Sequence, residues 1–369
     1  MTAGETSPRY APWNARLNDL RGQGLWRTLT SIQPTGPTTA RVDGQAVTIA
    51  CSNDYLGLSH HPKMSEGPLQ AGAGSSRLIT GTRPAHLELE QELQDWLGQP
   101  ALLFSSGYLA NLALFSTVCT QDDVIASDAL NHASIIDGMR LSKARKVIVE
   151  HCAPDQIPPD ATLIAVEGLF SMDGDTPALQ DYPSKPWLAV DEAHSLGCIG
   201  PEGRGVAAAC GVTPDIVIGT FGKAFGAAGA FVAGPQLLKD LLINAGRSFI
   251  YSTAPPESTI QKIRTGLAII RTEGEERRER LQARTRQLRQ GLGQIGLEPL
   301  GTHHIVPITF GEQTMTVARG LKEAGILATG IRFPTVPKGM ERIRFTVCSE
   351  HTPDQIDHIL GTLDKQVSR

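Results

Sequence analysis

The chain has 369 residues, of which 40% are hydrophobic and 20% charged, and its formal net charge is −4. This composition is typical of a soluble globular protein long enough for one large and one small domain. The charge provides no basic field for nucleic acid or an anionic membrane. No apolar stretch approaches the ~18 residues of a membrane span, and residues 1–10 contain no secretory core, so we expect a cytoplasmic protein.

The cysteine pattern points the same way. The six cysteines include no C-x-x-C pair, which fits a reducing compartment and argues against both a metal site and a disulfide framework. We interpret them as small buried hydrophobic residues: Cys51, Cys119, Cys152, Cys198, Cys210 and Cys348.

Residues 1–45 are predicted to form an N-terminal arm. Leu17 and Leu20, followed by Gly22 and Gly24, indicate a helix that ends at the glycine pair. A strand-like run at 48–51 then passes into a polar turn at Asn53. The glycine-rich loop at 72–77 suits an anion, but it lacks the G-x-G-x-x-G spacing of a dinucleotide site.

Residues 46–254 are predicted to form a large α/β domain. Leu89, Leu93, Trp96 and Leu97 mark one face of a helix closed by Gly98. Beyond it, short apolar runs alternate with helical or loop segments, the pattern of a mostly parallel sheet with helices on both faces. These runs lie at 101–104, 124–126, 146–149, 163–166, 187–190, 216–218 and 230–233.

Residues 255–369 are predicted to form a smaller α+β domain. The charged segment 272–280 contains the i, i+4 pairs Glu273/Arg277 and Glu276/Arg280 and leads into leucines at helical spacing. We interpret it as a helix with a solvated face and an apolar stripe. Apolar runs at 305–310 and 343–347 are the expected strands of this domain.

Lys223 stands out because it is the one charge in a run of small and apolar residues, 217–229. A lysine in so dry a segment either reaches water or has its pKa lowered, and a lysine that is neutral part of the time is a nucleophile toward carbonyls. The competing interpretation is a surface lysine in a glycine-rich turn. A P-loop is excluded, since Val217 and Ala224 occupy the places of its first glycine and its Ser or Thr.

Asp191 and His194 follow an apolar strand, and Lys223 lies 32 residues after Asp191, at the end of what should be another strand. The carboxyl ends of such strands meet in one crevice. A strand-end aspartate, a nearby histidine and a lysine are what a pyridoxal phosphate (PLP) site requires, with a glycine-led helix start such as Gly107-Tyr108 for the phosphate. Taken singly, His132 and His194 are better explained as hydrogen-bonded core or capping histidines, and only together with Asp191 and Lys223 do they favour a PLP site.

Several ordered motifs resemble the α-oxoamine synthases, a family of PLP enzymes with the aspartate-aminotransferase-like fold. The resemblance extends from Leu25 to about Thr352 and therefore covers nearly the whole chain. The motifs are CSNDYLGLSHHP at 51–62, FSSGY at 104–108, NHAS at 131–134, EGLFSMDGD at 167–175, VDEAH at 190–194, TFGK at 220–223, YST at 251–253 and IRFPTVP at 331–337.

The resemblance implies a role for each matching residue. Lys223 would bind the cofactor and act as acid and base at the substrate Cα, Asp191 would pair with the pyridine nitrogen, and His132 would stack on the ring. Lys223, His132, Asp191 and His194 are thus the expected catalytic residues. The implied cofactor-binding residues are Gly107, Tyr108, His132, Glu167, Ser171, Asp191, His194, Thr220, Lys223 and, from the other subunit of a homodimer, Thr253.

The resemblance also implies a reaction, the decarboxylative condensation of an amino acid with an acyl thioester. The motif forms favour L-alanine and a pimeloyl group carried by CoA or by acyl carrier protein (ACP), as in biotin biosynthesis. The implied substrate-binding residues are Arg27, Asn53, His132, Arg332 and Thr335. The alternatives are a sibling that uses glycine, such as 2-amino-3-ketobutyrate CoA ligase or 5-aminolevulinate synthase, and a non-catalytic nucleotide-binding module.

Two places depart from the family. The segment 62–72 is shorter than expected, so the cover of the active site is expected to differ. Ser195-Leu196 stands where the family often has Gly-Thr or Ser-Thr.

Overall fold

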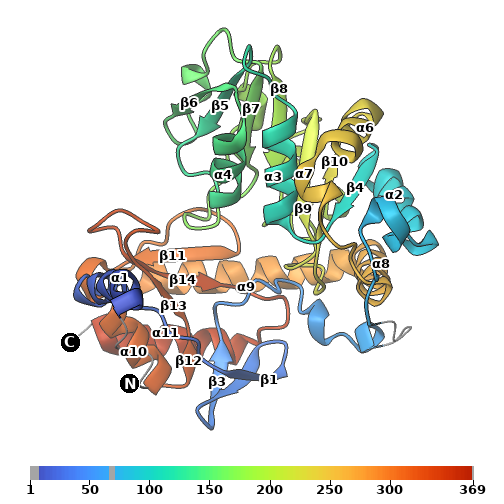
Figure 1. Ribbon diagram of the computed structural model, residues 1–369. Coiled ribbons are helices and arrows are strands. Elements are labelled where there is room, and N and C mark those ends of the chain that lie inside the picture. The colour runs from blue at the N-terminus through green and yellow to red at the C-terminus, as the bar shows by residue number, and fades with distance from the viewer. Residues whose placement is uncertain (1–7, 66–70, 368–369) are drawn as a thin grey trace.

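The computed structural model describes residues 8–65 and 71–367 (Figure 1). Part of the short segment 62–72, residues 66–70, and residues 1–7 at the start of the chain lie outside the described residues.

A seven-stranded sheet forms the centre of the larger part of the molecule. Its strands coincide with the seven apolar runs of the sequence. Six of these runs are almost entirely buried and so have no polar face to break them, whereas the run at 146–149, at the edge of the sheet, is partly exposed. Their order across the sheet is β4 (Ala101–Phe104), β10 (Ala230–Ala233), β9 (Ile216–Thr220), β8 (Trp187–Asp191), β7 (Leu163–Glu167), β5 (Val124–Asp128) and β6 (Arg145–Val149).

The expectation of a mostly parallel sheet is confirmed. Strands β9, β8, β7, β5 and β6 pair in parallel, whereas β10 is antiparallel to both β9 and β4. Residues 221–229, which join β9 to β10, are too few for the crossover that a parallel neighbour needs. The short connection therefore folds back as a turn, and Lys223 lies in that turn.

Helices cover both faces of this sheet (Figure 1). On one face, Leu102 and Phe104 of β4 pack with residues of α3, α4, α6 and α7, and on the other, Ala101 and Leu103 pack with α2, α8 and α9. Successive side chains of a strand point to opposite faces of the sheet, so one strand contributes to the helix layers on both faces. The helices are α2 (Pro84–Leu97), α3 (Gly107–Thr117), α4 (Ala133–Leu141), α5 (Val206–Ala209), α6 (Gln236–Ala245), α7 (Arg247–Ile250), α8 (Glu257–Thr272) and α9 (Gly274–Gln294).

The smaller part of the molecule contains two further sheets. One has the order β1 (Ile32–Gly36), β2 (Thr39–Val42), β3 (Gln45–Ile49) and β12 (Ile326–Leu327), and the other has the order β11 (Ile305–Thr309), β14 (Arg342–Thr346) and β13 (Thr329–Ile331). Helices α10 (Thr314–Glu323) and α11 (Pro353–Val367) pack with them. The predicted domain boundaries at 45/46 and 254/255 stay a prediction. Strand β3, near the N-terminal end of the chain, pairs with β12, near the C-terminal end.

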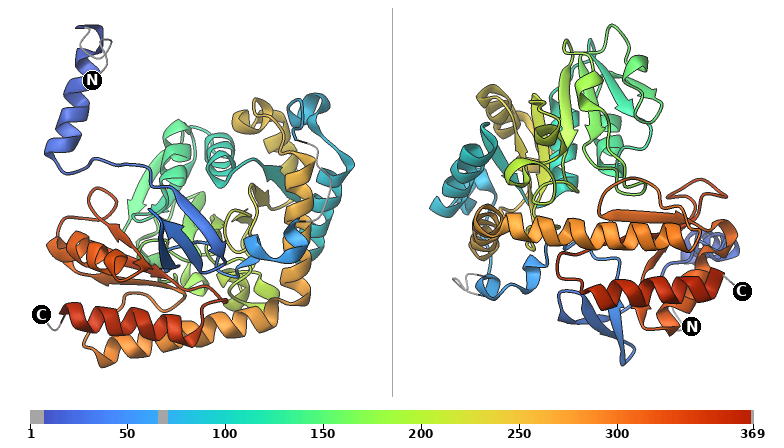
Figure 2. Two further views of the ribbon diagram at one scale, coloured as in Figure 1. Left: turned by 90° about the horizontal axis from the view of Figure 1, so that it is seen from below. Right: turned by 180° about the vertical axis from the view of Figure 1, so that it is seen from behind.

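The N-terminal helix α1 (Ala11–Gly22) projects from the body (Figure 2). It ends at the predicted glycine pair, and none of its residues is buried. The remaining short helices are η1 (Pro8–Tyr10), η2 (Leu58–His60), η3 (Pro62–Ser65), η4 (Arg77–Gly81), η5 (Pro154–Gln156), η6 (Leu179–Asp181), η7 (Pro201–Gly203) and η8 (Gly311–Gln313). Among the described residues, no helix has the length and apolar character needed to cross a membrane.

Candidate active site

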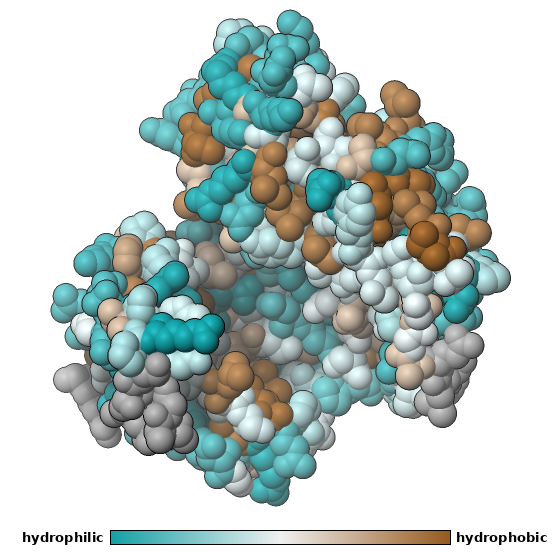
Figure 3. Space-filling model, in the orientation of Figure 1, coloured by the Kyte–Doolittle hydropathy of each residue, from teal (hydrophilic) through white to brown (hydrophobic). Residues whose placement is uncertain are grey.

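The carboxyl ends of the parallel strands open onto a cavity of about 180 Å³. Figure 3 shows the surface hollowed between the larger part of the molecule and β14. The cavity brings together eight of the predicted site residues, as expected for the ligand crevice of an open α/β sheet. Its lining consists of Gly107, Tyr108, Asn111, His132, Ser134, Glu167, Asp191, Ala193, His194, Ile218, Gly219, Thr220 and Lys223.

Lys223 enters the cavity from the turn between β9 and β10. Phe221 and Phe225 are completely buried on either side of it and anchor the turn in the core. Gly226 has φ 63°, and a Cβ there would lie 2.3 Å from the backbone nitrogen of Ser59, so the turn requires glycine. Burial lowers the pKa of Lys223 to about 8, although Asp191 and Glu167 act in the opposite direction.

Glu167 and Asp191 end the neighbouring strands β7 and β8 and are paired in register. Burial, followed by the nearby charge of Asp191, raises the pKa of Glu167. Asp191 accepts two hydrogen bonds, one from the backbone N–H of Ala193 at 3.0 Å and one from Nδ2 of Asn111 at 2.9 Å.

His194 is buried and contacts the side chain of Tyr55. Its Nδ1 lies 2.6 Å from the hydroxyl of Tyr55, whose ring packs 4.2 Å from that of His304. Burial, followed by the charge of Lys223, places the pKa of His194 well below its ordinary value. The one hydroxyl proton of Tyr55 is directed at Oδ1 of Asn53, at 3.0 Å, so Nδ1 of a neutral His194 donates its proton to the Tyr55 oxygen.

His132 is the N-cap residue of α4. Its Nδ1 lies 2.8 Å from the hydroxyl of Ser134 and 3.2 Å from the backbone nitrogen of Ser134. Burial lowers the pKa of His132, with Asp191 acting to raise it and Lys223 to lower it. The ring of Tyr108 meets it edge-on at 6.5 Å.

Gly107 and Tyr108 begin helix α3. Ser106 caps this helix by accepting a hydrogen bond from the backbone N–H of Leu109. The first N–H groups of a helix lack partners within it and attract anions. Thr220 lies nearby at the end of β9, with its hydroxyl donating to the carbonyl of Gly229 at 3.0 Å.

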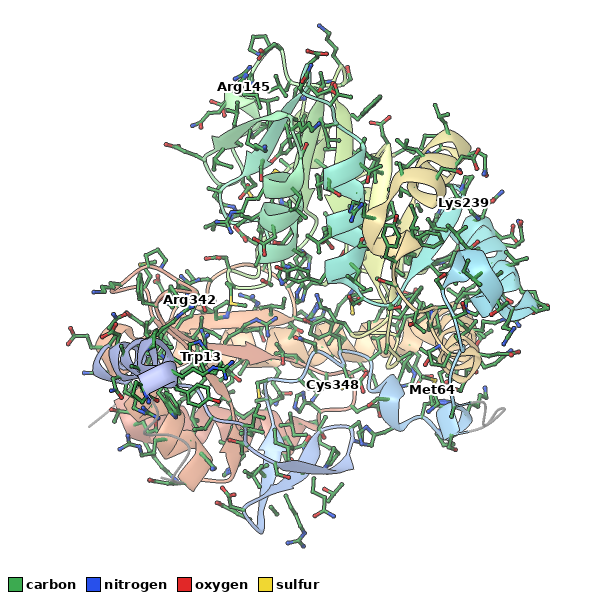
Figure 4. The ribbon with its side chains drawn as sticks, in the orientation of Figure 1. Trp13, Met64, Arg145, Lys239, Arg342 and Cys348 are labelled. Carbon is green, nitrogen blue, oxygen red and sulfur yellow. The ribbon has the colours of Figure 1, made fainter. Side chains whose placement is uncertain are left out.

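Ser171 and Asn53 do not line the cavity, but both contact Arg344 of β14. The Nε of Arg344 donates to the carbonyl of Ser171, and Nη1 lies 3.4 Å from Oδ1 of Asn53. Arg342, labelled in Figure 4, extends from the same strand to Asp173 at 2.6 Å. β14 thus holds the loop after β7 against the smaller part of the molecule.

Arg27, Arg332, Thr335 and Thr253 also lie outside the cavity lining. Arg332 donates to the carbonyl of Trp26 at 2.8 Å, which places the arm residue Arg27 next to the 332–335 segment. The side chain of Thr253 is exposed, and its carbonyl accepts a hydrogen bond from Ser105.

Sequence reasoning missed the partners of the predicted residues, namely Tyr55, Asn111, Ser134 and Arg344. A buried arginine in an apolar strand is a usable signal, since both Arg342 and Arg344 interrupt the apolar run of β14. Tyr55 and Ser134 lie within the quoted motifs. Their spacing in the sequence does not reveal which histidine they contact.

One group of possible metal ligands occurs among the described residues. Ligand atoms of Asp128, His151 and Cys152 lie within 4.8 Å of one another. However, both ring nitrogens of His151 contact carboxylates, Nδ1 with Asp128 at 3.0 Å and Nε2 with Asp175 at 2.8 Å. We assign this group to hydrogen bonding.

A comparison with known families matches residues 47–363 to the model described as aminotransferase class I and II. Among curated proteins, the chain is similar to an 8-amino-7-oxononanoate synthase of Trichlorobacter lovleyi. The two are 40% identical over 376 residues, covering 95% of this chain and 96% of the relative.

Two solved structures are similar to this chain in both sequence and fold. A serine palmitoyltransferase variant of S. paucimobilis with a bound PLP–myriocin aldimine is 30% identical, with a TM-score of 0.89 over 97% of both chains. An 8-amino-7-oxononanoate synthase of Francisella tularensis is 29% identical, with a TM-score of 0.75, over 87% of this chain and 98% of the other.

Proposed function

The chain belongs to the class I and II aminotransferases and, among them, to the 8-amino-7-oxononanoate synthases, and we propose that it condenses L-alanine with a pimeloyl thioester in biotin biosynthesis. It is a PLP-dependent acyltransferase. The proposed products are 8-amino-7-oxononanoate, CO2 and the free thiol. The observation that supports this best is one cavity in which Lys223, with a lowered pKa, shares the lining with Asp191, His132 and His194.

The residues of the cavity fit PLP. The N-terminus of α3 offers backbone N–H groups to a phosphate, and Asp191 offers a carboxylate to a protonated ring nitrogen. Oε1 of Glu167 and Oδ1 of Asn111 are buried polar atoms without a protein partner, which is consistent with a polar occupant. When bound, PLP supplies an electron sink for the carbanion that forms at the amino-acid Cα.

We propose that Lys223 holds the cofactor and then moves the proton at the substrate Cα. A pKa of about 8 leaves a substantial fraction of the amine neutral near physiological pH, and only the neutral amine can accept a proton. Asp191 holds the proton of the ring nitrogen. His194 and Ser171 would hold the ring oxygen, with Glu167 close by and Thr220 near the phosphate.

The substrate residues are proposed from the same motifs. Arg332 would bind the amino-acid carboxylate, a task that suits the bidentate guanidinium, with Asn53 and Thr335 nearby. Arg27 would meet the distal carboxylate of the pimeloyl chain. The contact between Arg332 and the Trp26 carbonyl supports this, since it keeps the two arginines on adjacent segments.

We also propose a homodimer in which Thr253 contributes to the cavity of the other subunit. Exposed apolar side chains support an interface on this side of the molecule, among them Ile79 with 75% and Tyr251 with 74% of the side chain exposed. Figure 3 shows apolar surface gathered over α7 and its neighbours. Such exposure on a soluble protein marks an interaction surface.

The test is to mix purified protein, PLP, L-alanine and pimeloyl-CoA, and to measure CO2, free thiol and the amino ketone. Pimeloyl-ACP is tested in parallel, and glycine and L-serine replace alanine as matched controls. We expect turnover with alanine and little with the other two. Turnover with glycine and not with alanine would replace the proposal by the glycine-using sibling. Absence of any PLP absorbance would favour a non-catalytic module.

A further inference from the structure

Asn111 hydrogen-bonds to two other residues of the cavity lining, Asp191 and Ser134. It lies in α3, is 1% exposed, and its Nδ2 is 2.9 Å from Oδ2 of Asp191 and 2.9 Å from the hydroxyl of Ser134. A carboxylate oxygen accepts hydrogen bonds, so the amide nitrogen must face Asp191. Both amide hydrogens are then used, one for each partner.

The direction of the next hydrogen bond follows from the first. The hydroxyl of Ser134 accepts from Asn111, so its own proton is available for Nδ1 of His132 at 2.8 Å. The backbone N–H of Ser134 is a second donor to the same nitrogen, at 3.2 Å, and it cannot reverse its direction. Nδ1 is therefore an acceptor, and a neutral ring must carry its proton on Nε2.

We propose that Asn111 and Ser134 are positioning residues that hold His132 as a neutral imidazole with its proton on Nε2. Asp191, Asn111, Ser134 and His132 then form one directional chain of hydrogen bonds, which we call the Asn111–Ser134 relay. The relay fixes the plane and the tautomer of the ring and leaves Nε2–H as its donor. It also couples the orientation of His132 to that of Asp191.

The charged groups around His132 come from three neighbouring strands. Asp191 ends β8, Lys223 follows β9, and Glu167 at the end of β7 accepts a hydrogen bond from the backbone of His132. Asp191 favours a charged ring, whereas Lys223 and burial disfavour it. The relay acts with burial, because protonating Nδ1 would disrupt the two hydrogen bonds donated to it.

The relay extends the proposed function to two residues for which the motifs implied no role, and it does not depend on which substrates are used. The relay and the proposed reaction are tested by different measurements. The protonation of the histidine nitrogens, with and without PLP, tests the relay, and the condensation assay tests the reaction.

The experiment is 15N NMR of the full-length protein labelled at histidine, with the His132 signals assigned by His132→Gln. In the wild type we expect a protonated Nε2 and an unprotonated, hydrogen-bonded Nδ1. Ser134→Ala should raise the pKa of His132 by roughly 0.5 to 1 unit, since one net hydrogen bond to the neutral form is lost. Ser134→Thr, which keeps the hydroxyl, should restore the wild-type value.

Asn111→Leu provides the second arm. Without the amide, the hydroxyl of Ser134 can turn to accept from a protonated Nδ1, so the pKa of His132 should again rise. The signals of the exposed His358 should not move in any variant, and thermal melting identifies variants that fold. A proton on Nδ1 of His132 in the wild type, or a folded Ser134→Ala protein with an unchanged His132 pKa, would overturn the relay.

Discussion

The histidines of this protein show how surroundings decide what an imidazole does. His132 and His194 line the cavity, each with a hydroxyl at Nδ1, and the pKa of each is lowered. His151 follows the carboxyl end of β6 and has a carboxylate at each ring nitrogen, Asp128 at 3.0 Å and Asp175 at 2.8 Å. Burial opposes its charge, but the hydrogen bonds with Asp128 and Asp175 raise its pKa to about 12.

The difference separates a chemical region from a structural one. A neutral imidazole can donate or stack without bringing a charge into the site, which suits a cavity that contains Lys223 and Asp191. The charged His151 instead ties the end of β5 to Asp175, in the loop that follows β7. We call Asp128, His151 and Asp175 the histidine clasp. We expect substitutions in the cavity to lower turnover and leave stability unchanged, and substitutions in the clasp to lower stability more than turnover.

The largest effect is expected from Lys223→Ala, which should disable the cavity and leave the fold intact. Turnover should fall by at least about a thousandfold, because the proposed role of Lys223 is both to hold the cofactor and to transfer the proton. Melting of the cofactor-free variant should be no lower than that of the wild type, since a desolvated amine is removed. Lys185→Ala, at an exposed lysine, is the matched control. Full turnover by Lys223→Ala would contradict the assignment.

The converse change is His151→Gln, which should weaken the fold more than the chemistry. It leaves the buried carboxylate of Asp128 without its cation, and we expect a loss of about 2 to 3 kcal/mol in the free energy of unfolding. Turnover per folded molecule should fall far less than in Lys223→Ala. Urea unfolding and an assay of the same sample measure both. Unchanged stability would show that the clasp carries no charge.

The clasp also predicts a pH dependence. The pKa of His151 is raised in the folded protein, so the clasp contributes fully below the unfolded value of about 6.5 and is lost as the pH rises toward about 12. The stability difference between wild type and His151→Gln should therefore shrink between about pH 7 and about pH 9.5. A difference that stays constant or grows over this range would rule out a charged His151.

A smaller effect is expected from Tyr55→Phe, which removes the hydroxyl at Nδ1 of His194. Loss of one net hydrogen bond should lower turnover about five- to tenfold, with little change in substrate KM, because the effect acts through His194. Tyr182→Phe, outside the cavity, should have no effect on turnover. An unaltered rate in Tyr55→Phe would mean that His194 does not need this hydrogen-bond partner.

The smallest effect is expected from Arg145→Ala. Arg145, labelled in Figure 4, pairs with Asp160, and both side chains are more than half exposed. Removing this pair should change the free energy of unfolding by less than about 0.5 kcal/mol. A cost comparable to that of His151→Gln would show that charge pairing alone, without burial, accounts for the clasp.

How much of the fold was predictable follows from burial. The strands of the large sheet were found because runs such as Ala101–Phe104 are wholly buried. β1 was missed because its residues are mostly exposed and include Pro34, so no apolar pattern marks it. β12 has two residues and pairs with β3 from the other end of the chain, a contact that no local pattern encodes.

In the site, residue type and strand-end position predicted Lys223, Asp191 and His194, which share one cavity. Their partners could not be read in the same way, because Tyr55 is 139 residues from His194, and Asn111 is 80 residues from Asp191. These contacts arise only when the strands and α3 are packed together. The relay and the Tyr55 hydroxyl therefore required the three-dimensional structure.

The most direct test of the account is to identify the lysine that binds PLP. The holoprotein is reduced with borohydride and digested, and the peptides are analysed by mass spectrometry. We predict bleaching of the visible absorbance and a pyridoxyl group on the peptide that contains Lys223. A pyridoxyl group on another lysine, or none on any peptide after reduction, would contradict the assignment of the active site.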